Sequence, residues 1–192
     1  MVNVLVPLAE GCEELEAITV IDLLRRADII VTTASLDTGT TVNPVLASRG
    51  TKIIPDITLD QALERASQQA YDMLVLPGGL PGADYLDQDK RIHQLLKQMQ
   101  AQNKFTAAIC AAPKVLANAK LLEGKNATSY PGVIDSMDLP NTKISGQNVV
   151  IDGKVVTSRG PATAMEFALS LIEVLLDKSK RDEVANGLLW VG

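Results

Sequence analysis

The sequence contains one histidine and two cysteines among 192 residues. Zinc centres of the usual kind need several Cys or His ligands, so we expect no such site, and we predict neither a metal nor another cofactor. A Ser-His-Asp triad would have to use His93. This residue lies off the apolar stripe of a polar helical segment, so we expect an exposed histidine there. Two cysteines in a chain of this length do not make a disulfide framework.

Long apolar runs are also missing. No segment approaches the roughly 18 uninterrupted apolar residues of a membrane-spanning helix. The first residues, Met1 to Pro7, lack the basic region of a signal peptide. The net charge of −5 argues against tight binding to nucleic acid or to a membrane surface. We therefore expect a soluble, cytoplasmic protein.

Aromatic residues make up only 3% of the chain, so the core must be built from Val, Ile, Leu and Ala. The hydrophobic fraction of 46% is normal for a globular protein. The chain is long enough for one substantial core, and it contains no linker, repeat or low-complexity segment. We expect a single domain over residues 1–192.

Apolar strand-like runs alternate with helical patterns, which is typical of an α/β domain with a mostly parallel sheet. We expect strands at 2–7, 29–36, 72–76 and 105–109, short strands within 42–54 and 127–130, and a hairpin at 149–157 with an Asp-Gly turn. We expect helices at 13–26, 60–66, 89–102, 114–120, 161–176 and 178–186.

Three features follow the carboxyl ends of predicted strands, where open parallel sheets bind ligands. They are the acidic segment Ala9–Glu16, the turn Pro77-Gly78-Gly79 and the residue Cys110. We expect them to converge on one site.

Cys110 ends an apolar run and stands directly before a predicted helix. The helix dipole and unpaired N–H groups at such a corner stabilise a thiolate, so the thiol pKa should fall. The alternative is a small cysteine packed in the core, which is the commoner role of a free cysteine. Its position at a strand end favours the reactive role.

Two further features would complete a site around this sulfur. Gly79 permits a turn that aims its N–H outward, and with the Ala111 N–H it would form an oxyanion hole. Glu16 follows the first strand on a helix and would project toward Cys110. Burial and a neighbouring negative charge would raise the pKa of its carboxyl group. The alternatives are an ordinary strand-ending turn and a solvated helix cap.

The sequence resembles the ThiJ/PfpI superfamily, in the branch of bacterial YajL and the human parkinsonism-associated deglycase. The resemblance runs in register along nearly the whole chain. It is carried by Glu13-Glu14-Leu15-Glu16, Asp22-Leu23-Leu24-Arg25-Arg26-Ala27, Val75-Leu76-Pro77-Gly78-Gly79, Ala107-Ala108-Ile109-Cys110-Ala111-Ala112-Pro113 and Thr157-Ser158-Arg159-Gly160-Pro161.

The resemblance implies a flavodoxin-like three-layer sandwich of the class I glutamine amidotransferase type, and a homodimer. Cys110 matches the oxidisable catalytic cysteine and Glu16 its carboxyl partner. Gly79 and Ala111 match the backbone donors beside the sulfur. The remaining pocket positions implied by the resemblance are Gly78 and Tyr130, together with Arg26 and Arg49, which match arginines that line the pocket or the dimer seam of the family. For the two arginines, surface solubilisation is the alternative.

Tyr130 marks a departure, because many superfamily members have a histidine at this place. A phenol with a pKa near 10 is a poor general base at neutral pH, although it can donate a hydrogen bond. This weakens a protease or amidase interpretation. It affects less a mechanism in which Glu16 moves protons and Cys110 attacks a carbonyl group.

The resemblance implies a cysteine-dependent deglycase or glyoxalase-type hydrolase acting on methylglyoxal, glyoxal and their adducts on protein or nucleotide amino groups. The alternative is a redox-sensing stress chaperone, in which oxidation of Cys110 to a sulfinate is the signal. An amidase function ranks last. Cys12, beside several glutamates, is interpreted as a packed residue and at most a secondary oxidation site.

Overall fold

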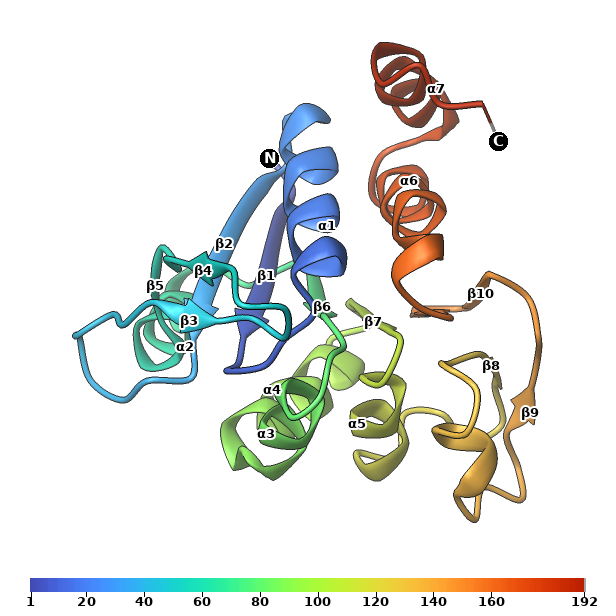
Figure 1. Cartoon of the computed structure of the whole chain (residues 1–192), viewed down its shortest axis with the longest axis horizontal. Coiled ribbons are helices and arrows are strands. Elements are labelled where there is room, and N and C mark those ends of the chain that lie inside the picture. Colours follow the sequence, from blue (N-terminus) through green and yellow to red (C-terminus); the bar gives the residue numbers. More distant parts are fainter. Residues whose placement is uncertain (192) are drawn as a thin grey trace.

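A computed structural model describes residues 1–191 and shows a seven-stranded sheet (Figure 1). The strand order is β10-β11-β7-β6-β1-β2-β5, and only the pair β10–β11 is antiparallel. The strands are β1 (Asn3–Leu8), β2 (Ile30–Ser35), β5 (Ile57–Thr58), β6 (Met73–Leu76), β7 (Phe105–Ile109), β10 (Val149–Asp152) and β11 (Val155–Ser158).

Helices cover both faces of the sheet, which gives three layers (Figure 1). One layer contains α1 (Glu14–Arg26), α6 (Ala164–Leu175) and α7 (Lys178–Gly187). The other contains α2 (Leu59–Gln68), α4 (Lys90–Ala101) and α5 (Pro113–Asn118), with α3 (Gly82–Gln88) between β6 and α4 in the chain. The predicted α/β fold with a mostly parallel sheet is confirmed.

Alternate residues of the buried strands build two cores, one on each face of the sheet. In β1, Val4 and Val6 face the core under α1 and α6, whereas Leu5 faces the core under α4 and α5. Phe167 is the largest fully buried side chain, and most of the rest are aliphatic. The scarcity of aromatic residues is therefore met by close packing of Val, Leu, Ile and Ala.

The segments that the sequence left unassigned are short and irregular. Helix α3 lies where a Pro-Gly segment and three acidic residues obscure the helical pattern. The edge strand β5 has only two residues. The short strands expected within 42–54 are present as β3 (Val45–Leu46) and β4 (Lys52–Ile53), which pair with each other. The strand expected at 127–130 lies slightly earlier, as β8 (Asn126–Ala127), and pairs with β9 (Lys143–Ile144), which the sequence left unassigned. Two 3₁₀ turns are η1 (Ile134–Ser136) and η2 (Pro161–Thr163).

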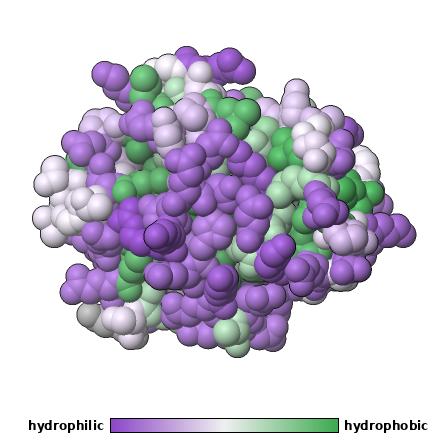
Figure 2. Space-filling view, turned by 90° about the horizontal axis from the view of Figure 1, so that it is seen from below, coloured by the Kyte–Doolittle hydropathy of each residue, from purple (hydrophilic) through white to green (hydrophobic). Residues whose placement is uncertain are grey.

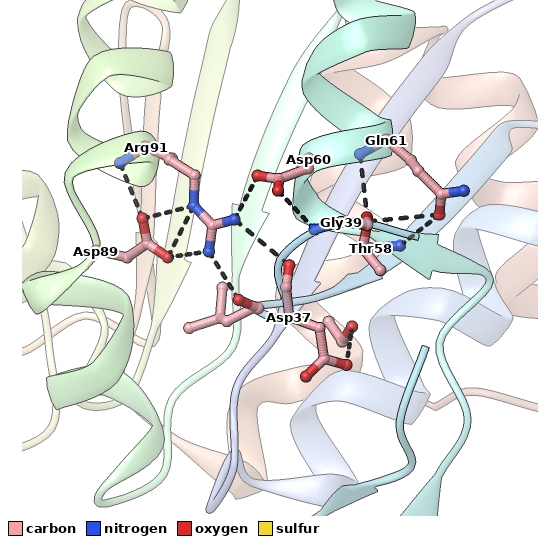
Figure 3. Close-up of polar contacts among 9 residues, drawn as sticks. Asp37, Gly39, Thr58, Asp60, Gln61, Asp89 and Arg91 are labelled. Atoms are coloured by element: carbon pink, nitrogen blue, oxygen red, sulfur yellow. Dashed lines mark hydrogen bonds and ion pairs between the residues drawn. The ribbon is translucent and has the colours of Figure 1, made fainter. Parts of the chain in front are cut away.

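One arginine ties the loop after β2 to two helices (Figure 3). Arg91 forms ion pairs with Asp89 and Asp60 at 2.6 Å and donates to the carbonyl oxygens of Leu36 and Asp37. Asp60 in turn accepts from the Gly39 N–H at 2.8 Å. The starts of α2 and α4 and the carboxyl end of β2 are thereby joined through one planar guanidinium group.

The single histidine differs from expectation. Ile92, Leu95, Leu96 and Met99 form the buried stripe of α4 as predicted. His93, however, is half-buried rather than exposed, because its Nε2 lies 2.7 Å from the carbonyl oxygen of Asp87. His93 thereby links α4 to Asp87 of α3, and it lies outside the site described below.

The face seen in Figure 2 is mostly hydrophilic, and its apolar residues form separate small groups. Within residues 1–191, none of the helices has the length and apolar character needed to cross a bilayer. In the same part of the chain, no three metal-ligating side chains come together.

Candidate active site

Four strand ends meet at the carboxyl edge of the sheet. The sequence indicated those of β1, β6 and β7; the fourth is that of β11, which runs parallel to β7. Ser158 ends β11, and Arg159 and Gly160 follow it. Their place was missed because β11 was interpreted only as one arm of a hairpin. The same strand-end rule, applied to β11, would have found them.

Cys110 adopts a left-handed backbone conformation with φ of 63°. A side chain in this conformation is strained by an estimated 1–3 kcal/mol, so the surroundings must impose it. The Cys110 N–H donates to the Ser158 carbonyl and its own carbonyl accepts from the Tyr130 N–H, both at 2.9 Å. The sharp turn places the thiol beside Glu16 and Gly160, at the carboxyl edge of the sheet.

Glu16 is fully buried, so it is not the solvated helix cap that was the alternative. Glu13 begins α1 as its N-cap and accepts from the Glu16 N–H at 2.8 Å, which sets Glu16 in the first turn. Oε2 of Glu16 accepts from the Gly78 N–H at 2.9 Å. Oε1 has no hydrogen-bond partner within the described chain. A buried oxygen without a partner is costly and is typical of a functional group.

Gly78 lies between these two side chains. A Cβ at this position would lie 2.6 Å from Cβ of Cys110 and 2.8 Å from Oε2 of Glu16. Gly79 has φ of 88°, and a Cβ there would lie 2.5 Å from the Gly11 carbonyl oxygen. Only glycine fits at either position.

Burial raises the pKa of Glu16 to about 7, even though hydrogen bonds from the Gly78 N–H and the Cys110 thiol lower it. The pKa of Glu16 is therefore raised, as predicted, and the carboxyl group titrates near neutrality. That is the range in which a general base is most effective.

The thiol departs from expectation. Burial, then the charge of Glu16, raises the pKa of Cys110 to about 12, against the lowering effect of the Gly79 and Ala111 N–H groups. The predicted lowering of the thiol pKa is not found, because Cys110 is only 9% exposed. Helix α5 also has just six residues, so its dipole is small. While Glu16 carries the negative charge, the sulfur is a neutral thiol.

Tyr130 lies at the mouth of the site with its side chain half exposed. A Cβ on Gly160 would lie 3.3 Å from the Tyr130 ring and 4.0 Å from the Cys110 sulfur, so the three residues meet. A cavity of about 360 Å³ opens here, lined by Tyr130, Asn148, Arg159, Gly160 and residues 161–163.

The two arginines implied by the resemblance lie elsewhere. Arg26 stands in the last turn of α1, ten residues after Glu16, and pairs with Asp22 at 2.7 Å. A rise of 1.5 Å per residue puts it roughly 15 Å from the site, so it does not line the pocket of this chain. Arg49 is exposed on the turn between β3 and β4, and its N–H donates to Glu14. Neither arginine contacts Cys110.

Cys12 is buried below the glycine turn and does not share the site. Burial, followed by the charges of Glu14, Glu10 and Glu13, raises the pKa of its thiol to about 12. Unlike Cys110, Cys12 has no exposed surface, so it is interpreted as a packed side chain rather than a nucleophile.

Residues 2–174 match the model of the DJ-1/PfpI family. The chain belongs to this family. Its relatives in the DJ-1/PfpI family include protein dj-1beta of Drosophila melanogaster, 42% identical over 97% of this chain and 96% of the relative. The crystal structure of that relative superposes with a TM-score of 0.90 over 100% of this chain and 99% of the other.

Two further relatives have informative names. The Parkinson disease protein 7 homolog of Danio rerio is 40% identical over 96% of this chain and 95% of its own. The glutathione-independent glyoxalase DJR-1.2 of Caenorhabditis elegans is 35% identical over 93% and 91%. The predicted membership and the predicted fold are both confirmed, and the DJ-1/PfpI family includes a glyoxalase.

Proposed function

We propose that this protein is a cysteine-dependent glyoxalase-type hydrolase that also removes early adducts of 2-oxoaldehydes from amino groups. The observation that carries the proposal is the buried pair of Glu16, with a pKa of about 7, and the thiol of Cys110 on its left-handed turn. A base that titrates near neutrality beside a nucleophile is the arrangement that carbonyl addition requires.

The reaction begins when Cys110 adds to the aldehyde carbon of methylglyoxal. The carbon–sulfur bond forms as the thiol proton passes to the Glu16 carboxylate. The aldehyde oxygen becomes an oxyanion, which accepts from the N–H groups of Gly79 and Ala111. Glu16 then gives the proton it received from the thiol to this oxygen, which forms the hemithioacetal and restores the Glu16 carboxylate. A bound proton on Glu16 also removes the negative charge that opposes attack by sulfur.

In the second half of the reaction, the hemithioacetal rearranges without an external reagent. Glu16 takes the proton from the former aldehyde carbon and returns it to the neighbouring ketone carbon, through an enediol. The first carbon is thereby oxidised and the second reduced, so no external oxidant is needed. Water hydrolyses the resulting thioester to lactate and regenerates the thiol. For an adduct on an amine, the carbon–nitrogen bond breaks and the amine leaves.

The test is conversion of methylglyoxal to lactate by wild type, Cys110→Ser and Glu16→Gln, with Cys12→Ser as a matched thiol control. We expect at least a ~10³-fold loss of kcat/KM in the first variant and a ~10²-fold loss in the second. Cys12→Ser should turn over methylglyoxal like wild type. Equal activity in wild type and Cys110→Ser would reject the enzyme proposal.

A second function, a redox-sensing stress chaperone, is favoured by the same two N–H groups. Two molecules of peroxide would oxidise the thiol to a sulfinate and leave two molecules of water. The sulfinate oxygens would accept from the Gly79 and Ala111 N–H groups. Clean sulfinate formation in peroxide, together with negligible turnover of methylglyoxal, would support this function over the enzyme.

We also infer a homodimer that works in the cytoplasm. Leu15 and Ile18 on α1 are about half exposed, and so is Leu46 on the adjoining β3. Glu14 joins α1 to this hairpin through Ser48 and Arg49, so these exposed apolar side chains lie on two linked elements. Both cysteines are free, as in a reducing compartment.

A further inference from the structure

We propose that the cavity beside Cys110 is an anion subsite, and that Arg159 binds a carboxylate or phosphate group carried by the substrate. The preferred substrates are then 2-oxoaldehydes, or their adducts, that bear such a group a few bonds from the reacting carbonyl. The choice of substrate rests on the proposed function, whereas the subsite itself does not.

The position of the cavity supports the proposal. Gly160 belongs to its lining, and a Cβ on Gly160 would lie 4.0 Å from the sulfur. A molecule whose carbonyl carbon contacts the sulfur therefore extends over Gly160 toward its chain neighbour, Arg159. The volume of about 360 Å³ accommodates a small ligand rather than a protein segment.

The positive charge of Arg159 has no carboxylate partner among the described residues. Its side chain is half-buried, and its single hydrogen bond runs from Nη1 to the carbonyl oxygen of Gly146 at 3.3 Å. Among residues 1–191, no carboxylate lies within ion-pair distance of it. A guanidinium without a counter-ion suits a planar anion, which it can bind through two hydrogen bonds.

Apart from Arg159, the residues that line the cavity carry no charge. None of the described side chains that form the wall of the cavity is acidic, in a chain with 23 acidic residues. Residues 161–163 lead into α6, so the positive end of that helix faces the cavity. The Asn148 amide, which also lines the cavity, donates to the Glu166 carboxylate at 2.9 Å.

The first test compares two alkylating reagents that differ in charge. Iodoacetate carries a carboxylate, and iodoacetamide has a neutral amide in its place. The ratio of their second-order rates at Cys110, measured by mass spectrometry in a Cys12→Ser background, reports the anion subsite without requiring turnover. We expect Arg159→Met to lower this ratio about 10-fold, and Arg159→Lys to lower it less. Arg65→Met, which removes a charge from the exposed face of α2, is the control.

A competition experiment requires no variant at residue 159. Inorganic phosphate and acetate, each at constant ionic strength, are tested for slowing the reaction with iodoacetate. Stronger protection by phosphate assigns the subsite to phosphate groups, and stronger protection by acetate assigns it to carboxylates. No protection by either anion, with an unchanged ratio in Arg159→Met, would overturn the proposal.

The substrate class is tested with 4,5-dioxopentanoate, a 2-oxoaldehyde with a distal carboxylate, against neutral methylglyoxal. We expect Arg159→Met to reduce the preference for the anionic compound, as the ratio of kcat/KM values, by about 10-fold. Turnover of methylglyoxal without any effect of Arg159 on either ratio would reject the subsite and retain the proposed function. If Arg159→Met lowers the alkylation ratio but neither compound is turned over, the subsite is retained and the proposed function is rejected.

Discussion

Glu16 and Cys110 lie on either side of Gly78, where a Cβ would come within 2.6 Å of Cβ of Cys110 and 2.8 Å of Oε2 of Glu16. The Gly78 N–H donates to Glu16 at 2.9 Å, while its Cα faces Cβ of Cys110. One residue therefore sets both the position of the Glu16 carboxyl group and the space available to the Cys110 side chain. Catalysis depends on such positioning to fractions of an ångström.

The first prediction concerns this glycine. Gly78→Ala places a Cβ 2.6 Å from Cβ of Cys110, so the turn must shift and the pair must separate. We expect at least a 10²-fold loss of methylglyoxal turnover. Gly146→Ala is the control, because nothing lies within 4 Å of a Cβ there. Wild-type activity in Gly78→Ala would show that the close approach is not needed.

The second prediction concerns pH and stability. The pKa of Glu16 is raised from 4.5 to about 7 on folding, so the folded state binds its proton more tightly than the unfolded state. The corresponding stability is fully present below pH 4.5 and is lost as pH rises to about 7. The shift is equivalent to about 3 kcal/mol.

Glu16→Gln removes this titration. Relative to wild type, the variant should gain stability between pH 4.5 and 7.5, because the wild type loses stability over that interval and the amide does not. Urea unfolding at several pH values measures the difference. A constant difference in the free energy of unfolding across this window would contradict the raised pKa.

The third prediction concerns Arg91. Lysine keeps the charge but cannot reach two carboxylates and two carbonyl oxygens at once. We expect Arg91→Lys to reduce the free energy of unfolding by about 1–3 kcal/mol, because the pair with Asp89 is largely buried. Arg25→Lys is the control; its ion pair with Asp56 is half exposed and should change stability by less than about 0.5 kcal/mol.

The fourth prediction concerns access to the sulfur. The Tyr130 ring packs on Gly160 beside Cys110, so its removal should expose the thiol. We expect Tyr130→Ala to increase the rate of alkylation of Cys110 by neutral iodoacetamide about 3- to 10-fold, and Tyr130→Phe to leave it near wild type. The matched pair separates the volume of the ring from its hydroxyl group. Equal rates in all three proteins would show that the ring does not cover the site.

The fifth prediction concerns the proposed dimer. Ile18→Asp places a charge on the apolar surface of α1 and should shift the sedimentation of the protein toward the monomer. Ile151→Asp makes the same change at an equally exposed residue on β10 and should leave the assembly unchanged. A monomeric wild type, or a dimer unaffected at Ile18, would reject this interface.

Long periodic segments were predictable from the sequence, and short irregular ones were not. Strand β1 and helices α1 and α6 have clear patterns, so local residues decide their structure. Strand β5 has two residues and exists only because β2 offers it an edge. The structure of such an element depends on the strand it pairs with, and the local sequence pattern contains no information about that partner.

Some properties of the site were predictable from the sequence and others were not. The strand-end rule brought Cys110 and Gly79 to one edge of the sheet, because it needs only the order of strands. The thiol pKa was predicted in the wrong direction, since the desolvation of a side chain depends on everything packed around it. Arg159 was missed as a candidate because an absent counter-ion becomes visible only once all carboxylates have positions in space.

The four strand ends that form the site come from distant parts of the chain, from β1 at residues 3–8 to β11 at residues 155–158. The turn of Cys110 is held by Ser158, so its strained backbone cannot exist before β11 is in place. During synthesis the thiol is thus an ordinary cysteine of a growing chain for most of the time that translation takes. Any reactivity toward aldehydes is acquired at the end, when nearly all of the protein has been made.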